Sequence, residues 1–266
     1  MLFGSIFDFT LNEDKLSWAV KIKLNKRNVE MINIPAKHKG KPVTVIDTEG
    51  FRFCENLIFV GIPEGIKEIR DGAFACCFGL EKIKISKTVE KIGTGAFDTC
   101  DKLTEIVVDD ENQSYKAIDN NLYSKDGEVL VKYASGKPDK EFLVPYDVKT
   151  IGERAFHFSK SLEKVVMKSS VEKIGAFAFG YCETLKSVKI PPNVREIEDS
   201  TFLNCTGMDS VIIPAGVKEI SSSAFREIKE ITIILSEDSD LTYTADRWNT
   251  EEHPIIVHIE RRKQIN

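Results

Sequence analysis

Residues 185–205 read LKSVKIPPNVREIEDSTFLNC, and the same apolar pattern stands 23 positions earlier, in residues 162–182, as LEKVVMKSSVEKIGAFAFGYC. The isoleucine of this pattern recurs every 23 residues in two runs, which a gap of 59 residues separates. Its members are Ile46, Ile69, Ile92, Ile151, Ile174, Ile197 and Ile220. A fixed period of about 20 to 30 residues predicts a solenoid, in which each repeat is one turn that buries its apolar face against its neighbours.

A phenylalanine follows each of these isoleucines after five residues, and a cysteine stands three residues further on in five of the seven repeats. The phenylalanines are Phe51, Phe74, Phe97, Phe156, Phe179, Phe202 and Phe225. The cysteines are Cys54, Cys77, Cys100, Cys182 and Cys205, with Ser159 and Ile228 in the other two places. Because these thiols occupy equivalent positions, we expect a buried, reduced ladder instead of disulfides or a metal site. Cys76 lies off this ladder and is expected to be an exposed thiol, with a reactive thiol as the alternative.

Residues 66–85 show what one turn contains. The apolar residues from Ala73 to Leu80 are spaced by one, three and three, which predicts one face of a short helical segment. Ile83 and Ile85 are two apart, which predicts a strand with one buried face. Each turn is therefore expected to hold a short strand, a bend, a helical or 3₁₀ segment and a second bend. Equivalent strand pairs predict about nine turns in parallel register: Ile32/Ile34, Val60/Ile62, Ile83/Ile85, Ile106/Val108, Phe142/Val144, Val165/Met167, Val188/Ile190, Val211/Ile213 and Ile231/Ile233.

The repeat motif L-x-x-V-x-I-P-x-x-V-x-x-I-G-x-x-A-F-x-x-C resembles the BspA-like class of leucine-rich repeats. The positions that match it are Leu185, Val188, Ile190, Pro191, Val194, Ile197, Phe202 and Cys205. The passage Ile34, Pro35, Gly40, Lys41, Pro42, Val43 is also similar to the opening of that family. The resemblance implies an α/β repeat solenoid, a right-handed leucine-rich-repeat rod of short parallel strands and short helical segments. It also implies a cell-surface or secreted protein.

Three segments make up the expected domain organisation. Residues 1–28 are predicted to form an N-terminal capping hairpin, since residues 7–11 and 18–24 alternate as strands do. Residues 29–234 are predicted to form the solenoid, and residues 235–266 a C-terminal cap and tail. In that cap, residues 254–259 are expected to add a final strand, with Trp248 packed on the end of the core. Such caps are needed because an open terminal repeat exposes its core.

The period breaks in residues 109–141, where a β-hairpin is expected to project from the solenoid. Asp126-Gly127 is a strong turn signal between the strand-like residues 122–123 and 129–131. Three tyrosines of this insertion are candidate contacts for a ligand, because aromatic rings with a polar tip suit interfaces. They are Tyr115, Tyr123 and Tyr133. The alternative is that these rings hold the hairpin against the solenoid.

Composition excludes several classes of partner. The net charge is −5 and the estimated pI is 5.6, whereas nucleic-acid-binding proteins carry a basic excess. The chain contains no run of 18 apolar residues, so its sequence predicts no membrane-spanning helix. Met1 to Asp8 lacks the basic start of a signal peptide, so we expect either a cytoplasmic protein or a surface protein whose export signal has been removed. Composition does not determine the oligomeric state.

No motif in the chain predicts catalysis, a metal site or a cofactor. The four histidines do not form a metal-binding or hydrolase motif with neighbouring acids or cysteines. Asp109-Asp110-Glu111 is an acidic run that we interpret as a solvated turn, with a calcium site as the alternative. We therefore expect a protein that is not an enzyme.

The strands offer a surface for binding. In each strand, the residue between the two buried positions faces outward. The candidate binding face consists of Lys84, Val107, Leu143, Val166, Lys189 and Ile212. An exposed apolar patch with charged residues at its rim is typical of an interaction site. The alternative is that these are ordinary strand-forming residues, over which the insertion folds.

Two functional hypotheses follow. The first is a non-catalytic module that binds a protein or glycan ligand, of the bacterial surface or adhesion type that the resemblance implies. The alternative is an intracellular structural or scaffolding protein that uses the solenoid as an interaction rod. Repeat folds serve many functions, so the fold by itself does not decide between them.

Overall fold

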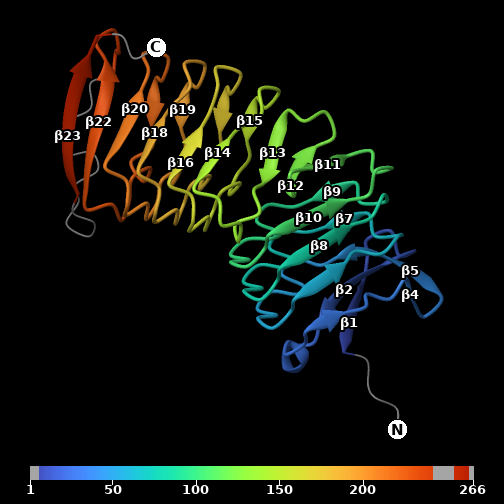
Figure 1. The fold of residues 1–266 in the computed structure, drawn as a ribbon. Coiled ribbons are helices and arrows are strands. Elements are labelled where there is room, and N and C mark those ends of the chain that lie inside the picture. Colours follow the sequence, from blue (N-terminus) through green and yellow to red (C-terminus); the bar gives the residue numbers. More distant parts are fainter. Residues whose placement is uncertain (1–5, 242–254, 264–266) are drawn as a thin grey trace. The chain divides into compact units, whose positions relative to one another are not determined.

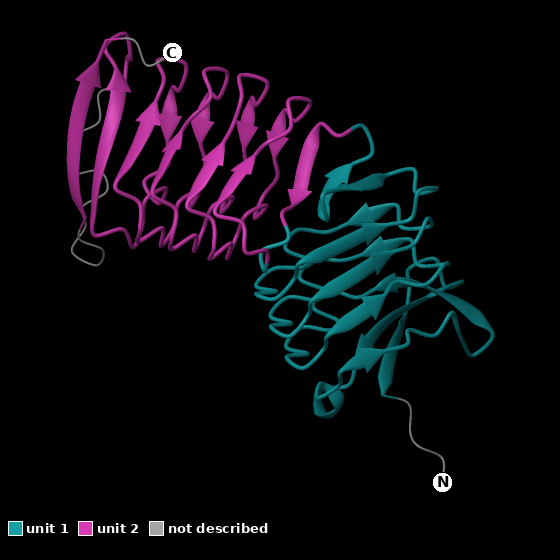
Figure 2. Ribbon diagram, in the orientation of Figure 1, with its two compact units in different colours: residues 1–126, 134–136 teal, residues 127–133, 137–266 magenta. Residues whose placement is uncertain are grey.

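The computed structural model describes residues 6–241 and 255–263. The chain forms two compact units, and each of them is a stack of short strands (Figure 1). Unit 1 comprises residues 1–126 and 134–136, and unit 2 comprises residues 127–133 and 137–266 (Figure 2). In the described part of the chain, the only helix is the 3₁₀ helix η1 at Leu24–Lys26.

Unit 1 begins with an antiparallel hairpin of two strands that extends a parallel ladder. The strands of this ladder are β1 (Phe7–Leu11), β2 (Trp18–Ile22), β5 (Lys41–Ile46), β7 (Glu68–Ile69) and β9 (Lys91–Ile92), with β4 (Lys37–His38) paired to β5. A second parallel ladder consists of β3 (Met31–Ile32), β6 (Phe59–Gly61), β8 (Lys82–Ile85) and β10 (Glu105–Val108). Each turn therefore contributes one strand to each ladder, and the two ladders enclose the core between them.

Unit 2 repeats this arrangement. One ladder consists of β14 (Glu141–Leu143), β16 (Lys164–Val166), β18 (Ser187–Lys189), β20 (Ser210–Ile213), β22 (Glu230–Ser236) and β23 (Ile256–Arg262). The facing strands are β13 (Val129–Lys132), β15 (Thr150–Ile151), β17 (Lys173–Ile174), β19 (Glu196–Ile197) and β21 (Glu219–Ile220). Neighbouring strands pair in parallel, and the paired residues are 21 to 26 positions apart in the chain.

The nine strand positions predicted from the sequence are occupied by β3, β6, β8, β10, β14, β16, β18, β20 and β22. The sequence analysis missed the second strand of each turn. The repeated isoleucines, such as Ile69 and Ile174, lie in these two-residue strands. Two residues are too few to show the alternation on which strand prediction depends.

The predicted helical segments are wrong, and the fold is a β-solenoid. Residues 70–79 form successive turns, in which Gly72 and Cys76 have positive φ angles of 60° and 58°. Left-handed residues cannot continue a right-handed helix. In addition, the amide groups of Phe74 and Cys76 donate to the carbonyls of Ala96 and Asp98 in the next turn, so they are not available for helical hydrogen bonds. The spacing of one, three and three thus reflects consecutive turns instead of a helix face.

Stacked phenylalanines form the centre of each core. In unit 1, the Phe51 and Phe74 ring centroids are 5.2 Å apart with nearly parallel planes. In unit 2, the rings of Phe156 and Phe179 lie 5.0 Å apart, and those of Phe179 and Phe202 lie 5.4 Å apart. These side chains are fully buried, so each ring packs between the rings of the turns before and after it.

The five ladder cysteines are buried, free thiols, as predicted. The Cys182 and Cys205 thiols donate to the carbonyls of Phe156 and Phe179, at 3.2 Å and 3.0 Å. Cys77 and Cys100 make the same contact with the turn before them. Each of these four thiols thus donates to a backbone acceptor inside the core.

Two terminal features and the insertion complete the fold. The predicted final strand is β23, which pairs in parallel with β22 from Ile256 to Arg262. The predicted contact of Trp248 lies outside the described residues. In the insertion, β11 (Tyr115–Ile118) and β12 (Asn121–Ser124) form an antiparallel hairpin in unit 1. Its turn is at Asp119 and Asn120, which both have positive φ angles. The predicted turn at Asp126-Gly127 is also present, since it follows β12 and leads into β13 with Gly127 at a φ of 89°.

Candidate functional site

The outward residues of the unit 2 strands form one continuous row, which we call the sheet face. It consists of Leu143, Val166, Lys189 and Ile212 on β14, β16, β18 and β20. Leu143 is directly opposite Val166, and Lys189 is directly opposite Ile212. Leu143 is 58% exposed, and the side chains of Val166 and Ile212 are half-buried. Flanking buried residues such as Val165 hold the backbone against the core, so the row is presented on a rigid support.

The other two predicted residues of the binding face belong to unit 1. Lys84 on β8 is opposite Val107 on β10, and Val107 is half-buried. Beside them, the Lys82 ammonium group lies 2.6 Å from the Glu105 carboxylate. The structure therefore brings the six predicted residues together as two groups, one in each unit.

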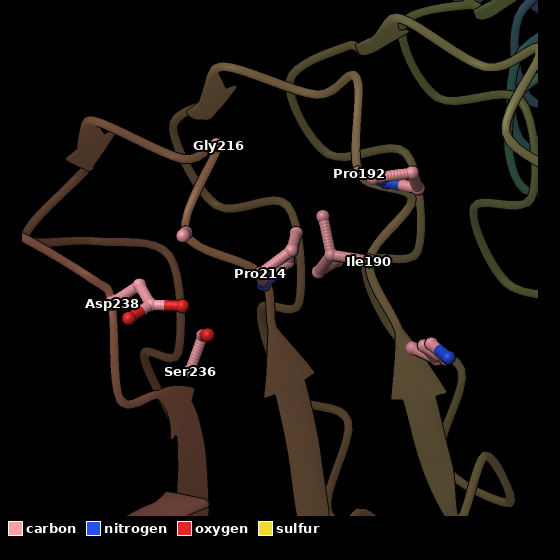
Figure 3. Close-up of a pocket in the computed structure, with 8 residues that line it drawn as sticks. Ile190, Pro192, Pro214, Gly216, Ser236 and Asp238 are labelled. Atoms are coloured by element: carbon pink, nitrogen blue, oxygen red, sulfur yellow. The ribbon is translucent and has the colours of Figure 1, made fainter. Parts of the chain in front are cut away.

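A pocket lies beyond the carboxyl ends of β18, β20 and β22, next to the sheet face. Its cavity volume is about 450 Å³, and Lys189 belongs to both the pocket and the sheet face. Figure 3 shows Ser236 and Asp238 on one side and Ile190 and Pro192 on the other, with Pro214 between them. A pocket of this size is large enough for a small-molecule ligand or one side chain of a larger partner.

The pocket combines an apolar floor with polar groups of both signs. Ile190 is buried, and two prolines and the backbone of Gly216 extend its surface. Asp238 and Lys189, whose side chains carry opposite charges, also line the pocket. The arrangement suits a ligand that has an apolar part and a hydrogen-bonding group at its end. The sequence analysis missed this pocket, although prolines at successive strand ends mark its wall.

The tyrosines of the insertion are mostly buried. Tyr123 and Tyr133 are 1% and 0% exposed, and burial raises the pKa of both phenols above the ordinary range. The Tyr133 hydroxyl donates to the Asp139 carboxylate at 3.1 Å. Tyr115 is half-buried, and its hydroxyl accepts a hydrogen bond from the Ile92 amide at 2.9 Å. The Tyr115 hydrogen bond and the packing of Tyr133 on Phe156, with ring centroids 5.4 Å apart, hold the insertion against the repeats, and burial leaves little of the Tyr123 and Tyr133 rings for a ligand.

A second row of side chains lies on the bends of the turns, and we call it the turn row. It contains Phe158, Tyr181, Asn204 and Glu227 in unit 2, and Phe53, Cys76 and Thr99 in unit 1. All seven have φ between 54° and 67°. This conformation costs residues other than glycine roughly 1–2 kcal/mol, and asparagine tolerates it best. Phenylalanine and tyrosine are therefore unfavourable choices for these positions, which suggests a use for their rings.

Among the described residues, no group of three or more histidine, cysteine or acidic side chains is arranged to hold a metal ion. The described residues also contain no helix that is long and apolar enough to cross a membrane. Asp109 caps the turn at the start of the insertion by accepting a hydrogen bond from the Glu111 amide. Glu111 forms an ion pair with Lys87, in which the two charged atoms lie 2.8 Å apart.

The repeat geometry agrees with a comparison to known families. A model of the BspA type leucine rich repeat region matches the chain in six copies, over residues 24–127 and 135–245. The chain belongs to this family. The two matched segments cover the turns of both units and most of the insertion. No curated protein sequence matches the chain.

Solved structures of bacterial leucine-rich repeat proteins resemble the chain. The pneumococcal vaccine antigen PcpA matches with a TM-score of 0.74 and 23% identity, over 87% of this chain and 63% of PcpA. A leucine-rich repeat protein from Eubacterium ventriosum matches with a TM-score of 0.59 and 20% identity, over 88% of this chain and 78% of the other. A leucine rich cell surface protein from Faecalibacterium prausnitzii matches with a TM-score of 0.52 and 23% identity, over 91% and 95%. At these identities the likeness shows the fold alone.

Proposed function

We propose that this BspA-type repeat protein is a non-catalytic binding module that recognises a protein or glycan ligand at the bacterial surface. The observation that carries the proposal is the sheet face of unit 2. There, exposed Leu143 lies opposite Val166, and Lys189 continues the row into a pocket of about 450 Å³. A row of apolar side chains beside a pocket and charged groups is typical of an interaction site.

The rigidity of the row supports a recognition role. β16, β18 and β20 have a ladder neighbour on both sides, β14 pairs with β16, and fully buried phenylalanines pack beneath the strands. A partner that docks on this surface does not have to order it first, so less binding free energy is lost to conformational entropy. The charge of Lys189 within a row of apolar side chains then favours a partner of complementary pattern.

The surface location is supported by the relatives' names. One solved structure is of a vaccine antigen, and another is of a cell surface protein. The chain covers 63% of the antigen's length, so the role of that whole protein comes to this chain only as part of the proposal.

The test is a binding screen of the intact protein against extracellular-matrix proteins and a glycan array. The variant Leu143→Glu/Val166→Glu places two carboxylates on the sheet face. The matched control, Leu16→Glu/Leu24→Glu, makes the same chemical change at two side chains of unit 1 that are 70% and 76% exposed. We expect a ligand that binds the wild type and the control, and loses at least about tenfold in affinity with the face variant.

Two results would count against the proposal. A ligand that the face variant binds as well as the wild type would remove the sheet face from the interaction. The absence of any ligand in the screen would favour the intracellular scaffold, whose partners are other proteins of the same cell. Circular dichroism of each variant excludes unfolding as the cause of a loss.

A further inference from the structure

We propose that the turn row of unit 2 contains a carbohydrate subsite, in which the face of the Tyr181 ring that Phe158 does not cover stacks on a pyranose and Asn204, Arg226 and Glu227 bind its hydroxyl groups. This site does not use the sheet face. A small pocket of about 300 Å³ marks its position, and its lining residues are Tyr181, Leu203, Asn204, Arg226 and Glu227.

The Tyr181 ring is held in a fixed orientation. One of its faces stacks on Phe158, which precedes it in the turn row, with centroids 4.6 Å apart and planes 5° from parallel. The buried His157 ring meets it nearly at right angles, with centroids 5.5 Å apart. Since Phe158 covers one face, the other face is directed toward the next turn, where Asn204 follows in the row. The ring is thus a preorganised platform.

The neighbouring turns supply the polar wall of the pocket. The Tyr181 backbone amide donates to the Leu203 carbonyl at 2.7 Å, and the Asn204 backbone amide donates to the Arg226 carbonyl at 2.8 Å. This backbone ladder positions each successive side chain one turn further along. The Arg226 guanidinium lies 3.6 Å from the Glu227 carboxylate, and both side chains are about half exposed to solvent.

These groups match the chemistry of a sugar. A pyranose ring presents a face of polarised C–H bonds, which are attracted to the negative face of an aromatic ring. Its hydroxyl groups donate and accept at the same time. The Asn204 side chain offers both a donor and an acceptor, and its Nδ2 lies 3.5 Å from the Glu183 carboxylate. The Arg226 guanidinium offers donors, and the Glu227 carboxylate offers acceptors. A peptide would not need this alternation of donors and acceptors around one flat ring.

Unit 1 provides an internal comparison. Phe53 has the same place in the turn row and is 41% exposed, with φ at 62°. The Arg52 guanidinium covers the Phe53 ring, with its central carbon 4.7 Å from the ring centroid. The next position in the row is Cys76, whereas the residue after Tyr181 in the row is Asn204 with its side-chain amide. The ring by itself therefore does not make the subsite. At Tyr181, the ring lines a pocket together with the polar side chains of Asn204, Arg226 and Glu227.

The experiment uses the full chain and a panel of methyl glycosides of glucose, galactose, mannose, fucose and N-acetylglucosamine, detected by saturation-transfer NMR and titration calorimetry. Tyr181→Asn removes the ring but suits the positive φ, because asparagine already occupies the equivalent position 204. Tyr181→Phe keeps the ring. The matched control Phe53→Asn removes an equivalent ring from unit 1.

We expect at least one pyranoside to bind the wild type, with an affinity that falls at least about tenfold in Tyr181→Asn and stays within about threefold in Tyr181→Phe and Phe53→Asn. The proposal is overturned if no pyranoside in the panel binds. It is also overturned if Tyr181→Asn binds as the wild type does, or if Phe53→Asn loses as much. The sheet-face variant Leu143→Glu/Val166→Glu should keep its sugar affinity, so a failure here leaves the proposed function standing.

Discussion

The buried ladder and the turn row are two positions of the same repeat, and they differ in how much the residue type varies. Inside the core, the ladder residue is phenylalanine in every repeat of both units. Two residues later, on the surface, the turn row changes from Phe158 to Tyr181, Asn204 and Glu227. The core position is constrained by stacking on both sides, whereas the surface position is constrained only by its positive φ. Residue choice in the turn row is therefore where one turn can differ in function from another.

The largest effect on stability is expected for Phe179→Ala in the buried ladder. Its ring stacks on Phe156 and Phe202, so truncation leaves a cavity between two turns. We expect a loss of about 3–5 kcal/mol in the free energy of unfolding, measured by native-state hydrogen exchange of unit 2 amides. A loss under about 1 kcal/mol would contradict the stacked core.

Thiol reactivity separates the same two positions chemically. The five ladder thiols are buried, whereas Cys76 in the turn row is partly exposed and beside Arg52. With Ellman's reagent we expect one fast thiol, and at least about a hundredfold slower reaction of the other five, since they react only after local unfolding. Cys76→Ser should abolish the fast phase. Five or six fast thiols would show that the ladder is open.

Alkaline pH should weaken unit 2 through its buried thiols. Burial raises the pKa of Cys182 to about 12 and that of Cys205 well above 9.0. The unfolded chain releases these protons at lower pH than the folded chain does, so stability is retained below about pH 9 and falls as pH rises toward about 12. The slope is about 1.4 kcal/mol per pH unit for each thiol. In urea unfolding at a series of pH values, Cys182→Ser should show a shallower fall, and an equal slope would contradict this assignment.

The smallest effect on stability is expected on the sheet face. Leu143→Glu/Val166→Glu should change the free energy of unfolding by less than about 1 kcal/mol, because both side chains already contact solvent. Urea unfolding of this variant beside Leu16→Glu/Leu24→Glu measures the difference. A loss as large as that of Phe179→Ala would mean that the face is part of the core.

The repeat and the buried ladder were predictable because every turn must fill the same core positions with side chains of the same kind. The isoleucine, phenylalanine and cysteine positions agree in residue type across the repeats, and the structure buries nearly all of them. The helical segments were not predictable from spacing, because turns closed by left-handed residues and a short helix can place apolar residues at the same intervals. Positive φ at Phe158, Phe177 or Tyr181 contradicts their local preference and has no signal in the sequence.

The site was less predictable than the fold. The outward residues of the strands follow from alternation, so the sheet face could be identified by position. The pocket beside Pro214 and the packing around Tyr181 depend on side chains from neighbouring turns, which no single repeat reveals. Buried Lys132 was also missed. Its ammonium group lies 3.2 Å from the His157 carbonyl, and this core contact depends on where the insertion rejoins the repeats.

The ladder of backbone bonds between turns has an evolutionary consequence. Backbone amides in the bends, such as those of Phe156, Phe179 and Phe202, donate to a carbonyl 22 residues later. Each turn therefore supplies hydrogen-bond acceptors for the backbone amides of the turn before it. Duplication or loss of a whole 23-residue turn leaves every such amide with an equivalent acceptor. Any other change of length within the stack breaks some of the backbone hydrogen bonds between turns. Chains of this kind can therefore grow or shrink by recombination in discrete steps, and each new turn adds one position at which a side chain can diversify without disturbing the stack.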